Sequence, residues 1–410
     1  MSWDLKRDLE TIRKEFPILE QCVYLISNSL GAAPKKAADS LKRFYSLWAE
    51  DGVSAWEKEW WGLSRKVGNQ VASLLGAKED EVTMQVNATL SHWVVLSTQF
   101  HPGSKKDGKR NKIVITDHDF PSIIYAVSRI SEIMGWKVEL LTSHGEPGLK
   151  AERIIDAIDD KTLFVSTSHV YFKSAYIQDI QQIAARAREA GALTLIDGYH
   201  APGTIPVDVK RLDVDFYVGG CLKWLCGGPG NAFLYVRPEL AEKLQPHLTG
   251  WFAHKEPFLF SQDMEFTQGS YRFMSGTPPV PSLYTAQAGL EIIKQIGVPA
   301  IREKSLALTD LISKKAKEKG FQLYTPEEEH LRGGAVSIGL PHAFAVKLAL
   351  EQRGIKVDFR KGERKEPDII RVGPHFYSKM EEVEILFQEI EALYSSGEYK
   401  KFKDDIRHVT

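Results

Sequence analysis

Strand-like and helix-like patterns alternate through most of the first 290 residues, and this alternation constrains the fold more than any other feature. Short apolar runs typical of buried strands are separated by helical patterns such as those at 151–159 and 179–191. The expected strands are KIVIT (112–116), KVELLT (137–142), TLFVSTSHV (162–170), LTLID (193–197), FYVGG (216–220) and AFLYV (232–236). The chain is therefore predicted to be an α/β protein with a large, mainly parallel sheet and helices on both faces.

A smaller α+β unit is expected after this sheet. From SLYTAQAGLEIIKQIG (282–297) onward, a helix is expected to lead away from the sheet. The later segments GGAVSIGL (333–340) and DIIRVG (368–373) have the character of strands. The closing helix is expected at 381–396. The predicted division is an N-terminal arm (1–35) that packs on the small domain and the active site, a large domain (36–290) and a small domain (291–410). No internal repeat or low-complexity linker marks the boundary near residue 290.

Composition excludes several classes of protein. A net charge of −1 and 43% hydrophobic residues describe an ordinary globular chain, with no electrostatic sign of a nucleic-acid or membrane partner. The basic run at 105–112 is interpreted as a solvated loop. Neither a signal peptide nor an apolar run of membrane-spanning length is found, so the cytoplasm is the expected location. The three cysteines have no disulfide or zinc spacing, and no metal is expected.

Lys223 lies in an otherwise apolar or small-residue stretch, VGGCLKWLCGGPGNAFLYV (218–236). The strand-like flanks predict that it occupies a short turn between two buried strands. Burial of an ammonium group without a partner is unfavourable and lowers its pKa, and a neutral amine is the form that Schiff-base chemistry needs. The following glycines allow the backbone to approach a bound group closely. The alternative is a lysine whose amine simply reaches water.

A second pattern favours the chemical interpretation of Lys223. The apolar run ALTLID ends in Asp197, and His200 follows three residues later. Ligands of parallel sheets bind at the carboxyl ends of the strands, where a carboxylate can pair with a protonated ring nitrogen. Pyridoxal 5'-phosphate (PLP) needs such a partner together with a lysine, so the two patterns together predict a PLP site.

The order of these segments resembles that of kynureninases, members of the class V (fold type I) PLP-dependent aminotransferase superfamily. The resemblance covers residues from about 20 to about 395. It rests on the segments YLISNSLGAAP (24–34), HDFPSIIYA (118–126), GWFAHKEPF (250–258), RFMSGTPPVPSL (272–283), REKSLALTD (302–310) and PDIIRVGPHFYSKMEEV (367–383). It implies a fold type I transferase with a seven-stranded type of sheet and a smaller C-terminal domain.

The resemblance also implies the cofactor contacts. The expected contacts are Ala88, Thr89, Phe120, Ser122, Ser168, Asp197, His200, Lys223, Trp251 and Thr277. Ala88 and Thr89 open a helix, whose free N–H groups suit a phosphate, although a plain helix start capped by Asn87 or Thr89 is the alternative. Phe120 matches an aromatic residue that stacks on the pyridine ring. Trp251 and Thr277 match residues that reach the phosphate of a neighbouring subunit, which implies a homodimer with active sites at the interface.

Arg371 is the expected partner of the substrate carboxylate. It lies on a predicted strand, where a buried guanidinium needs an anion, and the matching arginine of the family holds the amino acid carboxylate. A structural salt bridge to an aspartate or glutamate is the alternative. Asn28, Ser29 and Ser275 are further candidates for substrate contacts. The tryptophans at 56–61 are interpreted either as the lining of an aromatic-substrate pocket or as packing.

The implied activity is that of a kynureninase in tryptophan catabolism. Water and L-kynurenine or 3-hydroxykynurenine would give L-alanine and anthranilate or its hydroxy derivative, with Lys223, Asp197 and His200 as the catalytic residues. Two positions differ from the family pattern: Leu222 replaces a tyrosine and Ile123 replaces a carboxylate. Other class V activities therefore stay open, namely β-lyase, epimerase, aminotransferase or desulfurase-like reactions. A desulfurase would need a nucleophilic cysteine, but none follows Cys226. A non-catalytic dimer with this fold is the remaining alternative.

Overall fold

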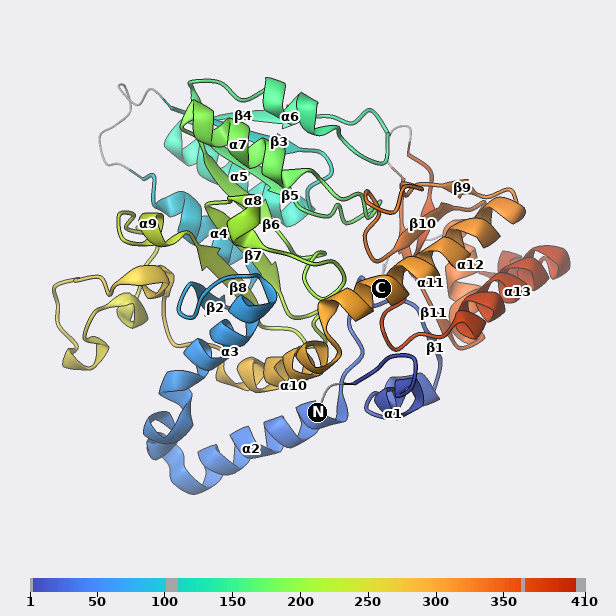
Figure 1. The fold of residues 1–410 in the computed structure, drawn as a ribbon, viewed down its shortest axis with the longest axis horizontal. Helices are drawn as coiled ribbons and strands as arrows, with labels where there is room; N and C mark the ends of the chain where they lie inside the picture. The colour runs from blue at the N-terminus through green and yellow to red at the C-terminus, as the bar shows by residue number, and fades with distance from the viewer. Residues whose placement is uncertain (1–2, 101–109, 363–365, 403–410) are drawn as a thin grey trace.

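The structure is a computed structural model that describes residues 3–100, 110–362 and 366–402. A seven-stranded sheet forms the centre of its large unit (Figure 1). The sheet has the strand order β2-β8-β7-β6-β5-β3-β4. Its strands are β2 (Val82–Gln85), β3 (Lys112–Thr116), β4 (Lys137–Leu141), β5 (Thr162–Ser168), β6 (Leu193–Asp197), β7 (Phe216–Gly220) and β8 (Ala232–Val236). Strand β8 runs antiparallel to both of its neighbours, and the pairs from β7 to β4 are parallel.

The predicted α/β fold class is confirmed, and all six expected strands are present. Strand β2 was not predicted, because the short segment VTMQ has neither a long apolar run nor a clear alternation. Its four residues are nevertheless all buried, since β8 pairs with it on one side and helix α3 (Trp61–Leu74) packs against it. Tertiary contacts therefore decided this strand.

Helices cover both faces of the large sheet. The helices of the large unit are α2 (Lys35–Asp51), α3, α4 (Ala88–Ser97), α5 (Pro121–Met134), α6 (Ala151–Asp156), α7 (Ile180–Ala190), α8 (Val209–Leu212), α9 (Pro238–Ala241) and α10 (Val280–Ile296). Ile113 and Ile115 of β3 belong to the same buried cluster as Val127 of α5. Val114, between them, belongs to another cluster with Ile183 of α7. Alternate residues of one strand are therefore buried on opposite faces.

The C-terminal unit combines a four-stranded antiparallel sheet with three longer helices, and lies to the right in Figure 1. Its strands are β9 (Gln322–Leu323), β10 (Val336–Gly339), β12 (Asp358–Arg360) and β13 (Ile369–Val372), in the order β12-β13-β10-β9. Its helices are α11 (Val298–Glu318), α12 (Ala343–Gln352) and α13 (Met380–Ser396). Helix α10 spans the expected boundary at residue 290, and only Gly297 separates it from α11.

The N-terminal segment connects the two units. It contains α1 (Leu9–Arg13) and β1 (Val23–Tyr24), and β1 pairs in parallel with β11 (Ile355–Lys356) of the C-terminal unit. The backbone N–H of Gly31 then donates to the carbonyl of Leu222 at 3.0 Å. A Cβ atom at Gly31 would lie 2.1 Å from the Lys223 carbonyl oxygen, so only glycine allows this approach. The predicted domain boundaries stay a prediction.

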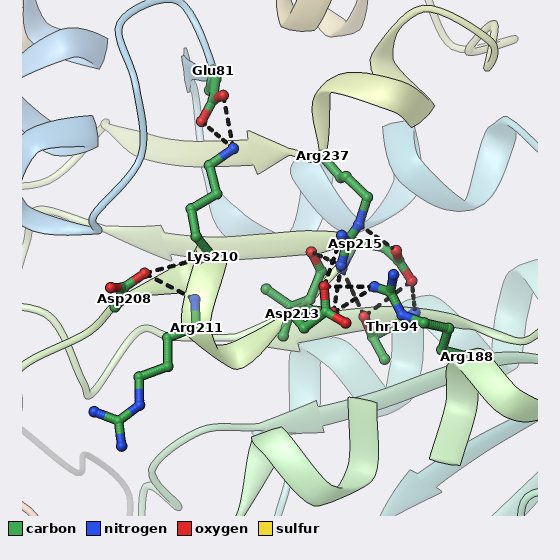
Figure 2. A network of polar contacts seen from close by, with 10 residues as sticks. Glu81, Arg188, Thr194, Asp208, Lys210, Arg211, Asp213, Asp215 and Arg237 are labelled. Carbon is green, nitrogen blue, oxygen red and sulfur yellow. Dashed lines mark hydrogen bonds and ion pairs between the residues drawn. The ribbon is translucent and has the colours of Figure 1, made fainter. Parts of the chain in front are cut away.

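A cluster of charged residues closes the edge of the sheet where β6 and β7 begin (Figure 2). Arg237 donates to Asp215 and Asp213 at 2.9 Å each, and Asp215 accepts from the backbone and the hydroxyl of Thr194. Arg188 contacts Asp213 at 2.8 Å. Burial lowers the pKa of Arg237, but the bond to Asp213 and the charge of Asp215 outweigh burial and raise it overall. We call these five residues the amino-end cluster.

Two predictions concern surface properties. Most of the basic run at 105–112 lies outside the described residues. None of the helices within the described ranges is long and apolar enough to cross a membrane.

Candidate active site

A cavity of about 210 Å³ opens at the carboxyl ends of β5, β6 and β7, on the opposite edge from the amino-end cluster. Its lining residues are Asn87, Ala88, Thr89, Phe120, Ser122, Ile123, Ser168, Val170, Phe172, Asp197, Tyr199, His200, Leu222 and Lys223. Eight predicted site residues, from five separate segments of the chain, are thus brought together. This is the place where parallel sheets bind ligands.

Lys223 projects its amine into this cavity from the connection between β7 and β8. The connection occupies residues 221–231, so the expected short turn is wrong. The segment is longer because it turns back through Gly228 and Gly230, both at positive φ, and Asn231 closes it with a hydrogen bond to the Gly227 carbonyl at 3.0 Å. The strands that flank the loop are buried throughout, as expected.

The amine of Lys223 is held in a low-dielectric environment. Its Nζ lies 2.7 Å from His200 Nε2, 4.7 Å from the ring centroid of Tyr199 and 5.7 Å from that of Phe120. Burial, and next the positive charge of Arg371, lower the pKa of Lys223 to about 7. Burial and the charge of Lys223 also lower the pKa of His200, so its imidazole is neutral. A substantial fraction of Lys223 is therefore a free amine near neutral pH.

Asp197 ends β6 and faces the same cavity. Its Oδ1 accepts from the backbone N–H of Tyr199 at 2.7 Å. Burial raises the pKa of this carboxyl group, and the charges of His92 and Lys223 act in the opposite direction. A buried carboxylate of this kind gains from a cationic partner, such as a protonated ring nitrogen.

Asp119 is a second buried carboxylate, which the sequence did not single out. Its Oδ1 accepts from the backbone and the hydroxyl of Ser168 at 2.7 Å each, and its Oδ2 accepts from the backbone and hydroxyl of Thr116. Burial raises its pKa to about 7 despite these bonds. The Ser168 hydroxyl donates to Asp119, so its position at the cavity wall is fixed by that carboxylate.

Helix α4 presents its amino terminus to the cavity. Asn87 is the capping residue, as the alternative interpretation allowed, and its side chain accepts from the Leu90 backbone at 2.9 Å. The cap leaves the N–H groups of Ala88 and Thr89, which also line the cavity, without an intrahelical acceptor. Such free N–H groups and the helix dipole favour an anion. The ring of Phe120 is 41% exposed and forms an aromatic wall beside them.

Arg371 lies next to this cavity, on β13. Its guanidinium group donates to the carbonyl of Phe172 and pairs with Asp358, and Ser29 donates to the same carboxylate at 2.8 Å. The structural salt bridge that the sequence left as an alternative is therefore present. Arg360 also contacts Asp358, at 2.6 Å, so two guanidinium groups share one carboxylate.

Several polar atoms around Arg371 have no partner within the described part of the chain. They are the Nε of Arg371 and both amide atoms of Asn28, and all are buried. Asn28 packs against Gly373, where a Cβ atom would lie 2.1 Å from its Oδ1. Unpaired buried polar groups cost stability, and a bound ligand can satisfy them.

Six predicted residues are not part of the cavity lining: Asn28, Ser29 and Arg371 form the neighbouring group described above, and three others lie elsewhere. Trp251 packs on Trp61 at 5.7 Å between ring centroids, and the Ser275 carbonyl accepts from the Phe252 backbone at 3.1 Å. Thr277 follows Ser275 in the same segment, and none of the three belongs to the lining. The tryptophans at 56–61 pack against one another and against Trp251, not into the cavity.

Sequence reasoning missed Asp119, Phe172, Tyr199 and Asp358. Asp119 lies within the segment HDFPSIIYA and Tyr199 lies between Asp197 and His200, but no spacing rule distinguishes them from turn residues. Phe172 and Asp358 belong to no segment that the sequence analysis singled out. Only the folded chain brings Asp358 to Arg371 and Tyr199 to Lys223.

The described cysteines offer no thiolate for catalysis. Burial raises the pKa of Cys221 to about 12 and raises that of Cys226 further, and neither residue lines the cavity. Burial also raises the pKa of Cys22, in the N-terminal segment. A thiolate mechanism therefore has no nucleophile within the described residues.

Comparisons with known proteins agree with this geometry. The aminotransferase class-V family profile matches residues 23–386. A kynureninase of Pseudomonas fluorescens is 32% identical to the chain over 382 residues, which cover 91% of this chain and 89% of that protein. The chain is a kynureninase-like member of the class V aminotransferase family. A kynureninase of Burkholderia mallei (strain SAVP1) is also 32% identical, over 378 residues covering 90% and 88% of the two chains.

Solved structures with this fold extend beyond kynureninases. A cysteine desulfurase from Thermococcus onnurineus NA1 has a TM-score of 0.82 and 23% identity to the kynureninase-like chain, and covers 94% of this chain and 98% of its own. The cystine C-S lyase C-DES has a TM-score of 0.80 with 21% identity, covering 92% and 98%. At these identities the similarity shows the fold alone. Together with the family, it identifies this kynureninase-like chain as a fold type I enzyme with pyridoxal 5'-phosphate as its cofactor.

Proposed function

We propose that the protein is a kynureninase that acts on L-kynurenine or 3-hydroxykynurenine. Water adds to the carbonyl carbon of the side chain, the Cβ–Cγ bond breaks, and the products are L-alanine and anthranilate or 3-hydroxyanthranilate. The observation that carries this proposal is the cavity where Lys223, His200 and Asp197 converge, in a chain 32% identical to a kynureninase over nearly its full length.

The residues of the cavity fit PLP. The free N–H groups of Ala88 and Thr89 suit the phosphate, the exposed face of Phe120 suits the ring, and Asp197 suits the ring nitrogen. Ser122 and Ser168 add hydroxyl groups to the wall. When bound, PLP supplies an electron sink that stabilises negative charge at the substrate α-carbon.

The remaining steps belong to the protein's own residues. Lys223, with its lowered pKa, takes the proton from the substrate α-carbon and later returns a proton. Asp197 keeps the ring nitrogen protonated, and His200 orients the lysine amine through the 2.7 Å contact. Asp197 and His200 are both buried, so water competes little for these contacts.

The substrate carboxylate is assigned to Arg371 and Asn28, with Ser29 beside them. Arg371 already pairs with Asp358, but Arg360 shares that carboxylate, and the three groups together keep a positive charge. The unpaired amide of Asn28 and Nε of Arg371 supply donors that an anion would satisfy. This combination favours a carboxylate ligand over a purely structural bridge.

We also propose a cytoplasmic homodimer in which Trp251, Thr277 and Ser275 act on the partner's site. All three lie on a segment outside their own cavity, and Phe258 and Phe260, which contact Trp251, are 53% and 75% exposed. Mixing Lys223→Ala with Trp251→Ala chains tests this assignment. Shared sites predict that the mixture regains activity that neither variant has alone, and no recovery would contradict them.

A different PLP-dependent cleavage is the second candidate. Leu222 and Ile123 both line the cavity, where the family pattern has a tyrosine and a carboxylate. Two apolar side chains in these places favour a changed reaction on another amino acid, such as β-elimination.

The deciding experiment is an assay of purified, PLP-loaded protein. Anthranilate fluorescence is followed with L-kynurenine and, separately, the 3-hydroxy product is followed with 3-hydroxykynurenine. Product that disappears in Lys223→Ala establishes the kynureninase activity. If no product forms while another amino acid changes the cofactor absorbance and yields pyruvate, the second candidate is correct.

A further inference from the structure

Tyr199 is the one phenol among the residues that line the cavity of the described chain. Its ring is the aromatic surface nearest to the Lys223 amine, at 4.7 Å, compared with 5.7 Å for Phe120. Any group joined to that amine must therefore lie close to the ring of Tyr199. The backbone N–H of the same residue donates to Asp197, which also lines the cavity.

The hydroxyl of Tyr199 is available for a ligand. It has no hydrogen-bond partner among the described protein groups. Burial, and next the charges of Cys221 and Asp197, raise its pKa, so the phenol keeps its proton and can donate. Tyr199 lines the cavity, so a ligand bound there can accept a hydrogen bond from this phenol.

Gly220 makes the space for this phenol. It is the buried last residue of β7, and a Cβ atom there would lie 2.6 Å from both Cζ and Oη of Tyr199. Its φ angle is not in the left-handed region, so the backbone itself would accept alanine. The glycine is therefore required by the tyrosine ring and not by local chain conformation.

We propose that Tyr199 is a further cofactor-binding residue whose phenol donates a hydrogen bond to an anionic oxygen of PLP, in a space that Gly220 keeps open. The inference rests on the proposed function only through the assignment of this cavity to PLP. Leu222, which also faces the cavity, offers no such bond, and the other hydroxyl groups of the lining belong to Thr89, Ser122 and Ser168.

The test measures PLP affinity instead of turnover. The holoenzyme is dialysed against decreasing concentrations of PLP, and the bound fraction is read from cofactor absorbance. Tyr199→Phe removes only the hydroxyl, and a lost bond to a charged acceptor predicts a dissociation constant raised by about tenfold to a hundredfold. Tyr45→Phe is the matched control, because its side chain is 66% exposed on α2, and it should match the wild type.

A double-mutant cycle assigns the role of Gly220. Gly220→Ala should weaken PLP binding in the wild type but not further in Tyr199→Ala, which lacks the ring that the new Cβ atom would displace. Equal weakening in both backgrounds would overturn the role of Gly220. Unchanged affinity in Tyr199→Phe, with circular dichroism confirming that the variant is folded, would overturn the proposal. If the wild-type protein binds no PLP, the cofactor site as a whole is refuted. That outcome is read from the wild-type titration alone, so it is distinguishable from a failure of the Tyr199 proposal.

Discussion

The two edges of the large sheet carry two very different polar clusters. At the amino ends, the carboxylates of Asp213 and Asp215 are bound by Arg237, and Arg188 and Thr194 add further bonds (Figure 2). Beside the cavity at the carboxyl ends, both amide atoms of Asn28 and the Nε of Arg371 are buried and have no partner among the described residues. The first cluster is complete without a ligand, and the second is not. We infer that the first cluster stabilises the fold and that the second is arranged for binding.

The pKa shifts follow the same division. Close partners raise the pKa of Arg237 and so stabilise its charged form. Burial lowers the pKa of Lys223 and raises that of Asp197, which destabilises the charged form of both. Perturbed groups that gather in one cavity are typical of catalytic sites.

The largest effect is expected from Lys223→Ala. Loss of the amine removes the covalent attachment of PLP and the proton acceptor, so turnover should fall by at least about a thousandfold. Borohydride treatment followed by mass spectrometry should trap PLP on the wild type and not on the variant. The free energy of unfolding of the cofactor-free protein should not fall, because a poorly solvated amine has been removed. A marked loss of stability would show that Lys223 stabilises the fold, as the amino-end cluster does, and would contradict the proposed contrast between the two clusters.

The second effect concerns the pH dependence of stability without PLP. The pKa of Lys223 is about 7 in the folded protein and about 10.5 when exposed, so the unfolded chain binds more protons between these values. The contribution of Lys223 to the free energy of unfolding should therefore rise as pH increases from 7 towards 10.5, on the order of 3 kcal/mol. Urea unfolding of wild type and Lys223→Met gives this contribution as a difference. The idea fails if the difference is constant over this range.

Arg237→Met should act oppositely to Lys223→Ala. It leaves Asp213 and Asp215 without their main cation and should lower the free energy of unfolding by about 2 kcal/mol, with little change in PLP affinity. Arg188→Met is the matched control, since Arg188 contacts the same Asp213 but its side chain is 51% exposed. Its effect should stay below about 0.5 kcal/mol. Equal losses in both variants would show that the amino-end cluster has no special role in stability.

The smallest effect is expected from Asn28→Ala. Removing an unpaired buried amide should leave the ligand-free protein as stable as before, or more stable by about 1 kcal/mol. The KM for the amino acid substrate should rise about tenfold if Asn28 binds its carboxylate. Thermal unfolding and steady-state kinetics measure the two quantities. A loss of stability with an unchanged KM would place Asn28 in the structural group.

Much of the fold was predictable because strands buried on both faces have distinctive sequences. KIVIT, LTLID, FYVGG and AFLYV became strands with the expected bounds, and Gly191 ended α7 as a left-handed cap. The short strand β2 was not predictable, since pairing with β8 and packing by α3 decided it. The loop that holds Lys223 was likewise longer than local pattern suggested.

The α/β class and the family were predictable from the amino-acid sequence, as were the segments that bear Lys223, Asp197, His200 and Arg371. Their residue types and order suffice, because the carboxyl ends of parallel strands meet at one edge of the sheet. The folded chain was needed to show that Asp358 pairs with Arg371, that Asp119 fixes Ser168 and that Tyr199 lies against Lys223. These contacts join residues on different strands and loops, and no spacing along the chain encodes the distances between them.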